Sequence, residues 1–340
     1  MDPIALTRQL VDIESITGNE AAVGEFLLFE LTALGFQAKK MPVPFPPEIA
    51  AGGRERFNVY ASTGGRPEIV FSTHMDTVPP FLGSREDETR IYGRGSCDAK
   101  GIMAAQIAAA LRLRDAGVKV GLLYVVGEER DSLGAATANS HSPKPRYLIN
   151  GEPTNNRLAV ASKGSLRVQL TAAGRMAHSA YPELGESAIN KLLDALQRLR
   201  AMKLAVHPEV GPSTLNIGLI EGGRAPNVVP DFASAQLQYR LVEPSDRLRK
   251  EIADAVSGLA QAEFVLEIPF VKLRTVPGLP TMVAAFTTDI PRLSNWGEPL
   301  LIGPGSIHTA HTDGEFIAKA ELLQAVDLYV RIAQELCGSK

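Results

Sequence analysis

The sequence has few cysteines and no long apolar run. Cys97 and Cys337 are the only cysteines among 340 residues, which is too few for a disulfide framework, and they do not form a CxxC zinc motif. No apolar run approaches the ~20 residues that a membrane span requires. Residues 1–10 lack the apolar stretch of a signal peptide. We therefore expect a protein of the reducing cytoplasm without membrane contact.

An excess of basic charge is also missing. The formal net charge is −3, so no positive field attracts nucleic acid or an anionic membrane. Apolar residues make up 45% of the chain and charged residues 21%, as in average globular proteins. Because 340 residues exceed one typical compact core, the length indicates about two domains.

The outer parts of the chain alternate between strand and helix patterns. Apolar runs predict strands at 57–62, 68–73, 118–126 and 146–150. Helical periodicity and composition predict helices at 19–34, with Asn19 as its cap, at 99–116 and at 322–336. This alternation is typical of an α/β domain with a mostly parallel sheet, and we assign residues 1–164 and 271–340 to it.

The middle of the chain follows a different order. Its predicted strands and helices, in chain order, are strand 166–173, helix 187–200, strands 213–221 and 233–241, helix 245–259 and strand 263–268. The order β-α-β-β-α-β is that of the ferredoxin-like α+β unit. We therefore expect residues 165–270 to form a compact inserted domain.

Histidine and acidic residues follow the ends of the predicted strands. His74 and Asp76 follow one strand, Glu128 and Glu129 another, and Glu152 a third. Ligands of open α/β sheets bind beyond the carboxyl ends of the strands. We expect these side chains to meet at one edge of the sheet.

The same edge requires a positive partner, because gathered carboxylates repel one another and destabilise a fold. Asp98, in a Gly-rich turn, and His308 and His311, near the C-terminus, are further candidate ligands. Imidazole nitrogen and carboxylate oxygen without thiolate suit zinc in an open catalytic site, with cobalt or manganese as alternatives. More donors than one ion needs predict two metal ions, about 3.5–4 Å apart.

Five segments, taken in order, resemble the M20 metallopeptidases. They read HMDTVP, YGRGSCDAKG, GEE, GEP and MAHSAYPELGESAI, and a late histidine follows them. The family includes acetylornithine deacetylase, succinyl-diaminopimelate desuccinylase, aminoacylase and glutamate carboxypeptidase. The resemblance covers nearly the whole chain, and the segment GPGS with the later AH looks most like the acetylornithine deacetylase and LysK-like branch.

The resemblance implies a fold and a set of metal ligands. It implies a dinuclear zinc hydrolase domain with an inserted lid or dimerisation domain, and two zinc ions per subunit. His74 and Glu152 would hold one ion, Glu129 and His311 the other, and Asp98 would bridge them.

The resemblance also implies catalytic roles. Glu128 would be the general base for a water activated between the metals, and Asp76 would hydrogen-bond the far nitrogen of the metal-binding histidine. His178, in the insert, would reach an active site across a homodimer and stabilise the oxyanion. Asn227 and Arg240 would bind the carboxylate or oxyanion of the substrate.

Plainer interpretations stand beside these roles. Asp98 alone could cap the helix that follows it, and Arg240 could pair with an acid. The choice between His308 and His311 depends on the resemblance, which favours His311. Cys97 fits a small packed side chain better than a ligand, because its side chain should point away from that of Asp98.

Three functions follow from this sequence. The first is hydrolysis of an N-acyl amino acid, such as acetylornithine or acetyl-lysine. The alternative is a dipeptidase or carboxypeptidase of the same family. The third, from another class, is an inactive metal-binding regulatory relative, and the complete ligand set argues against it.

Overall fold

The computed structural model describes residues 1–46 and 55–338. Two compact units divide the chain, and each is described by itself. Unit 1 comprises Met1–Val160, Leu273–Met282 and Thr288–Lys340, and unit 2 comprises Ala161–Lys272 and Val283–Thr287. These bounds differ by a few residues from the expected ones, and the short return of the chain to unit 2 at Val283–Thr287 was not predicted.

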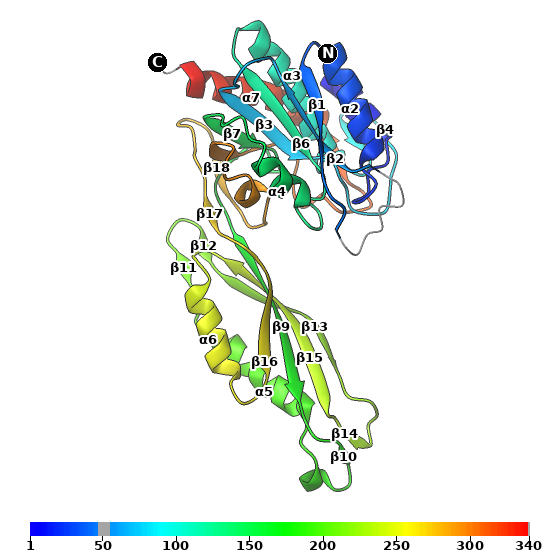
Figure 1. The fold of residues 1–340 in the computed structure, drawn as a ribbon, viewed down its shortest axis with the longest axis vertical. Helices are drawn as coiled ribbons and strands as arrows, with labels where there is room; N and C mark the ends of the chain where they lie inside the picture. The colour runs from blue at the N-terminus through cyan, green and yellow to red at the C-terminus, as the bar shows by residue number, and fades with distance from the viewer. Residues whose placement is uncertain (47–54, 339–340) are drawn as a thin grey trace. The chain divides into compact units, whose positions relative to one another are not determined.

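A six-stranded mixed sheet forms the centre of unit 1 (Figure 1). Its strands, in spatial order, are β1 (Gln37–Pro42), β2 (Phe57–Ser62), β6 (Val120–Val125), β3 (Ile69–His74), β7 (Tyr147–Asn150) and β19 (Glu298–Leu301). The last four run parallel, whereas β1 and β2 are antiparallel to their neighbours. The predicted α/β class with a mostly parallel sheet is confirmed.

Helices cover both faces of this sheet. One apolar core joins it to α1 (Pro3–Val11), α2 (Ala21–Ala33), α3 (Lys100–Asp115) and α7 (Lys319–Gly338), and a second core joins it to α4 (Leu133–Asn139) and Trp296. Adjacent strand residues point to opposite faces, so Phe71 belongs to the first core and Val70 to the second. Burial on both faces explains why β3 and β6 are apolar.

Short elements complete unit 1. One small sheet has the order β20 (Phe316–Ala318), β5 (Arg90–Tyr92) and β4 (Arg85–Glu86), and the helical turn η2 covers Ile290–Arg292. A second small sheet, where the chain passes between the units, has the order β17 (Val271–Lys272), β8 (Leu158–Ser162) and β18 (Thr281–Ala284). No helix within the described ranges is long and apolar enough to cross a membrane.

The start of the helix α2 differs from the expectation. The helix begins at Ala21 with Glu20 in the N-cap position, and no side chain caps it. Asn19, the expected cap, donates its side-chain amide to Glu14 over 3.3 Å instead. The carboxylate of Glu20 is buried against Arg56, at 3.3 Å, so tertiary packing sets this helix start.

Unit 2 contains a four-stranded antiparallel sheet. Its spatial order is β13 (Thr214–Gly222), β15 (Phe232–Leu241), β9 (Gly164–Ala173) and β16 (Gln261–Ile268). The helices α5 (Ala188–Ala201) and α6 (Asp246–Val256) supply the apolar core on one face. This is the expected ferredoxin-like arrangement.

Smaller elements extend unit 2. They are β10 (Ala177–His178), which pairs with β14 (Val228–Val229), β11 (Val206–His207), which pairs with β12 (Gly211–Pro212), and the helical turn η1 (Pro182–Leu184).

Truncation of Phe71 should destabilise unit 1 strongly. Its ring is fully buried and lies 5.3 Å, between centroids, from the ring of Tyr329 on α7. Phe71→Ala should lower the free energy of unfolding by about 3–5 kcal/mol, measured by denaturant titration. Phe29→Ala is the matched control, because Phe29 is 70% exposed and its loss should change stability by no more than about 0.5 kcal/mol. Equal effects would contradict this account of the core.

Candidate metal centre

The parallel strands of unit 1 bring several predicted ligands to one edge. His74 is the last residue of β3, Glu128 and Glu129 follow β6, and Glu152 follows β7. Because these strands are parallel neighbours, their carboxyl ends lie side by side. The segments just before α3 and β20 contribute Asp98 and His311 to the same place.

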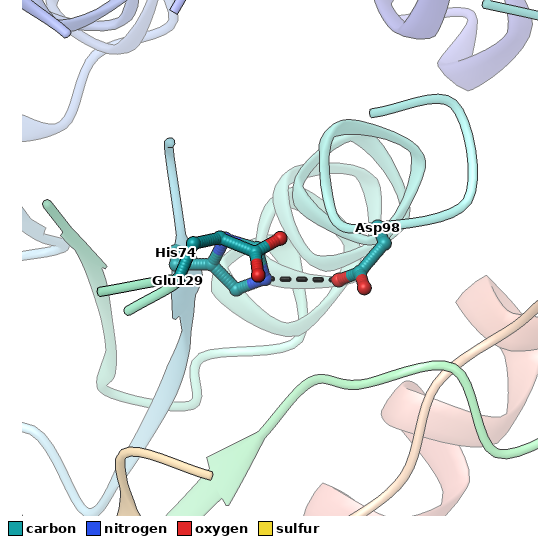
Figure 2. Close-up of side chains that lie close together, drawn as sticks. All are labelled: His74, Asp98 and Glu129. Carbon is teal, nitrogen blue, oxygen red and sulfur yellow. Dashed lines mark hydrogen bonds and ion pairs between the residues drawn. The ribbon is translucent and has the colours of Figure 1, made fainter. Parts of the chain in front are cut away.

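Four side chains are in direct contact. Nε2 of His74 lies 2.9 Å from Oδ1 of Asp98, a contact drawn in Figure 2. Nε2 of His311 lies 2.8 Å from Oε1 of Glu129 and 3.4 Å from Oδ2 of Asp98. Asp98 therefore lies between the two histidines. His74, Asp98 and Glu129 each offer a donor atom within 4.8 Å of the others.

Burial makes this cluster unusual. His74, Asp98 and Glu152 are 2%, 5% and 4% exposed, and Oε1 of Glu152 has no hydrogen-bond partner. A buried carboxylate oxygen without a partner costs free energy unless a cation binds it. The donors are imidazole nitrogens and carboxylate oxygens, so the residues present fit zinc or a similar divalent ion.

The pKa values follow from burial and from these contacts. The bonds from Asp98 and Glu129 raise the pKa of His311 to about 10. Burial lowers the pKa of His74, but the bond to Asp98 and its charge outweigh burial, so the pKa lies well above its ordinary value. Burial also raises the pKa of Glu128 and Glu152 well above the usual range. Without metal the cluster therefore holds protons at neutral pH, and metal binding must displace them.

Asp76 lies beside the far nitrogen of His74. Nδ1 of His74 lies 2.9 Å from the backbone carbonyl of Asp76 and 3.7 Å from its carboxylate. The close contact is made by the backbone carbonyl and not by the carboxylate. The buried carboxylate instead accepts the backbone N–H groups of Glu128 and Glu129 and the hydroxyl of Thr17, at 3.1, 3.2 and 2.8 Å. It holds the loop that carries both glutamates.

Three further observations settle smaller questions. His308 is exposed, and its backbone N–H donates to Ser306, whereas His311 enters the cluster. Asp98 does not cap α3, because Ala99 occupies the N-cap position and no side chain bonds there. Cys97 is fully buried, with its sulfur 3.5 Å from the carbonyl oxygen of Ser306, as expected of a packed side chain.

Buried charges around the cluster were missed at the sequence level. Glu315 and Arg94 form an ion pair beside Asp98, Arg56 pairs with Glu20 and Asp131, and Asp289 lies near Glu128. Burial raises the pKa of Asp289 to about 7. Sequence periodicity does not reveal such residues, because each pairs with a residue that is remote in the sequence. The one sign of this group in the sequence was Glu315, the acid four residues after His311.

The remaining candidates lie in unit 2. His178, on β10, and Asn227 lie close together, since the N–H of Ser179 donates to the carbonyl of Asn227 over 3.0 Å. Arg240 lies near the end of β15, whereas β14, which pairs with the strand of His178, precedes the start of β15. At a rise of ~3.3 Å per residue, the length of β15 places Arg240 roughly 25 Å from β14. His178 and Arg240 of one chain therefore do not meet.

Comparison with known proteins connects this centre to a family. Residues 160–264 match the model of the peptidase dimerisation domain of the M20 peptidases. A Schizosaccharomyces pombe peptidase M20 domain-containing protein is 39% identical over 97% of this chain and 83% of its own length. The chain belongs to the M20 peptidase family. It is accordingly a metal-dependent hydrolase.

Other M20 proteins agree with this assignment. An Aspergillus terreus protein named as a probable carboxypeptidase is 39% identical over 97% of this chain and 86% of its own length. The crystal structure of an aminopeptidase from Bacillus cereus superposes with a TM-score of 0.81 at 21% identity, covering 99% of this chain and 98% of that one. At this identity the second likeness concerns the fold alone.

Two histidine variants test the metal centre. His311→Ala should weaken binding of at least one metal ion by about ten-fold or more, because a nitrogen donor is lost. His308→Ala removes the exposed histidine three residues earlier and should leave metal binding unchanged. Zinc titration of chelator-stripped protein measures both. Wild-type affinity in His311→Ala would remove this residue from the ligand set.

Proposed function

We propose that this protein hydrolyses the amide bond of short peptides with a free carboxyl terminus, as a carboxypeptidase or dipeptidase. The cluster of His74, Asp98, Glu129 and His311, with the unpartnered Oε1 of Glu152, carries the proposal. The name of the Aspergillus terreus relative supports a peptide substrate rather than the N-acyl amino acid of our first expectation.

The cluster suits a centre of two divalent ions. His74 and Glu152 would hold one ion and Glu129 and His311 the other, with Asp98 between them. When bound, such ions supply Lewis-acid polarisation of a carbonyl and a lowered pKa for water. Zinc is the proposed metal, with cobalt or manganese as alternatives.

Glu128 is the proposed general base. It receives a proton from the attacking water and returns it to the leaving amine. In the metal-free centre, burial and the neighbouring Glu152 raise the pKa of Glu128. Bound cations would favour its carboxylate, which is the form that accepts a proton from water. Asp76 fixes the backbone at Glu128, at 3.1 Å, and so restricts where this carboxylate can lie.

Arg240 is the proposed partner of the substrate carboxylate. Asn227 and His178 lie far from Arg240 in the same chain, so they are proposed to reach the substrate from a second subunit. Arg240 is partly buried, and burial lowers its pKa from the usual value, with no opposing effect from an acid among the residues that the structure describes. An incoming carboxylate would supply the missing charge.

A matched substrate panel tests the proposed function. Chelator-stripped enzyme, reloaded with zinc, should cleave free dipeptides, N-blocked dipeptides or both faster than the acetylated form of the same C-terminal amino acid. Amidation of the C-terminus should lower kcat/KM by roughly 10–100-fold, because a charged hydrogen bond is lost. Glu128→Gln should bind zinc normally and lose about 10²–10⁴-fold in kcat.

The other outcomes discriminate among the candidate functions. Preferred cleavage of the acetylated amino acid would replace the peptidase by the deacylase. Metal binding without turnover of any compound would favour a regulatory relative. Full turnover by Glu128→Gln would overturn the assignment of the base.

We also propose a homodimer formed through unit 2. The edge strand β13 and the helix α5 expose apolar side chains, Leu193 at 52% and Ile220 at 56%. Both line one surface hollow together with Leu196 and Ile217. Exposed apolar patches and free strand edges are typical of subunit interfaces, and the match to a dimerisation domain supports a second copy as the partner.

A charge placed on this surface should separate the subunits. Ile220→Asp should shift the sedimenting species from dimer to monomer, because a carboxylate would be buried in an apolar contact. Val265→Asp is the matched control, since Val265 is 53% exposed on β16, at the opposite edge of the same sheet. A wild-type monomer, or a dimer unaffected by Ile220→Asp, would exclude this interface.

A further inference from the structure

The loop that carries Asp98 is held by one buried carboxylate. Oε1 of Glu315 accepts the backbone N–H groups of Gly95, Cys97 and Asp98, at 2.9, 3.1 and 3.1 Å. The side chain of Glu315 is 0% exposed. Three N–H groups directed at one oxygen fix the course of the loop from Gly95 to Asp98.

The other carboxylate oxygen binds a buried arginine. Oε2 of Glu315 lies 2.6 Å from Nη1 of Arg94, whose side chain is 2% exposed. The same Nη1 donates to the backbone carbonyl of Thr312 over 3.1 Å, and Thr312 follows His311 directly. The N–H of Gly93 donates to the carbonyl of Glu315, at 3.1 Å. The loop before α3 and the segment 311–315 are therefore joined from both sides.

These contacts connect the ion pair to the backbone at or next to two proposed ligands. Asp98 is bonded through its own N–H to Glu315, and His311 precedes the residue that Arg94 binds. The side chains of Asp98 and His311 face one another across 3.4 Å. A shift of either segment would change the distance between Asp98 and His311. In the hydrogen bonds described above, Arg94 and Glu315 bind backbone groups of these segments and not the ligand atoms.

Stability alone is a weak reason for such an ion pair. Burying two charges costs about as much free energy as their attraction returns, and apolar replacements are often no less stable. Groups that hydrogen-bond to metal ligands, in contrast, commonly set the orientation of those ligands, and their loss changes the affinity for metal.

We propose that the Arg94–Glu315 ion pair is a positioning device that sets the separation of Asp98 and His311 and thereby the affinity for metal. The inference rests on the proposed metal centre. Glu315 and Arg94 are positioning residues, since they act through the loops that they hold.

Cobalt titration of the chelator-stripped full chain tests the inference, because the visible spectrum of bound Co²⁺ reports ligand geometry independently of activity. Wild-type protein should bind two ions. Glu315→Gln, which keeps the size and loses the charge, should raise the Kd of at least one ion by roughly 10–100-fold and alter its spectrum. Arg94→Lys, which keeps the charge and loses the planar fork, should act in the same direction.

Asp87→Asn is the matched control. Asp87 also accepts two backbone N–H groups, from Thr89 and Arg90, at 2.7 and 2.8 Å. It lies in the neighbouring hairpin, outside the ligand-bearing loops, so cobalt binding should stay at the wild-type level.

The outcomes separate the inference from the proposed function. A wild-type chain that binds no cobalt would refute the metal centre itself. Folded Glu315→Gln with wild-type Kd values and spectrum, whatever its thermal stability, would overturn the positioning role and leave the metal centre intact. If Glu315→Gln fails to fold, Arg94→Lys decides by the same criterion.

Discussion

Asp76 and Glu315 are nearly inaccessible to solvent, and each accepts hydrogen bonds from consecutive or nearby backbone N–H groups of a loop. Asp76 holds the loop of Glu128 and Glu129, and Glu315 holds the loop of Asp98. Carboxylates accept such bonds more strongly than neutral groups do. The geometry of the candidate centre depends on this second layer of acids, because the carboxylates among the ligands repel one another.

The acids of the centre also explain its buried cations. Arg94 and Arg56 have 2% and 0% exposed side chains; Arg94 pairs with Glu315, and Arg56 pairs with Glu20 and Asp131. Glycine is needed where Arg56 approaches, since a Cβ on Gly127 would lie 2.2 Å from Nη2 of Arg56. Gly127 immediately precedes Glu128, so the close approach places the guanidinium of Arg56 next to the loop of the proposed base.

Sequence patterns predicted the parts of this structure whose signal is local. The apolar run at β6 and the acids directly after it were sufficient to place Glu128 and Glu129 at a sheet edge. The strand β19 was not predicted, because its four residues follow Gly297, include Pro299 and pair with β7, about 150 residues earlier in the sequence. The polar edge strand β1 and the helix α4 likewise lack a strong periodic signal.

The candidate site divides in the same way. The ligands could be listed because strand ends and a family resemblance marked them, whereas the atoms through which Asp76 acts depend on the backbone path after β3. Glu315 was visible only as an acid after a histidine. Its three N–H donors come from a loop more than 200 residues away in the sequence, which no local pattern reveals.

The discontinuity of unit 1 has a consequence for synthesis on the ribosome. Apart from a short later return, unit 2 is continuous from Ala161 to Lys272 and can fold as soon as it emerges, whereas the sheet of unit 1 lacks β19 until residue 301 has been made. His311 and Glu315 arrive later still. The strands β2, β3, β6 and β7 are therefore made before the insert, and the candidate metal centre stays incomplete until residues 311–315 have been translated.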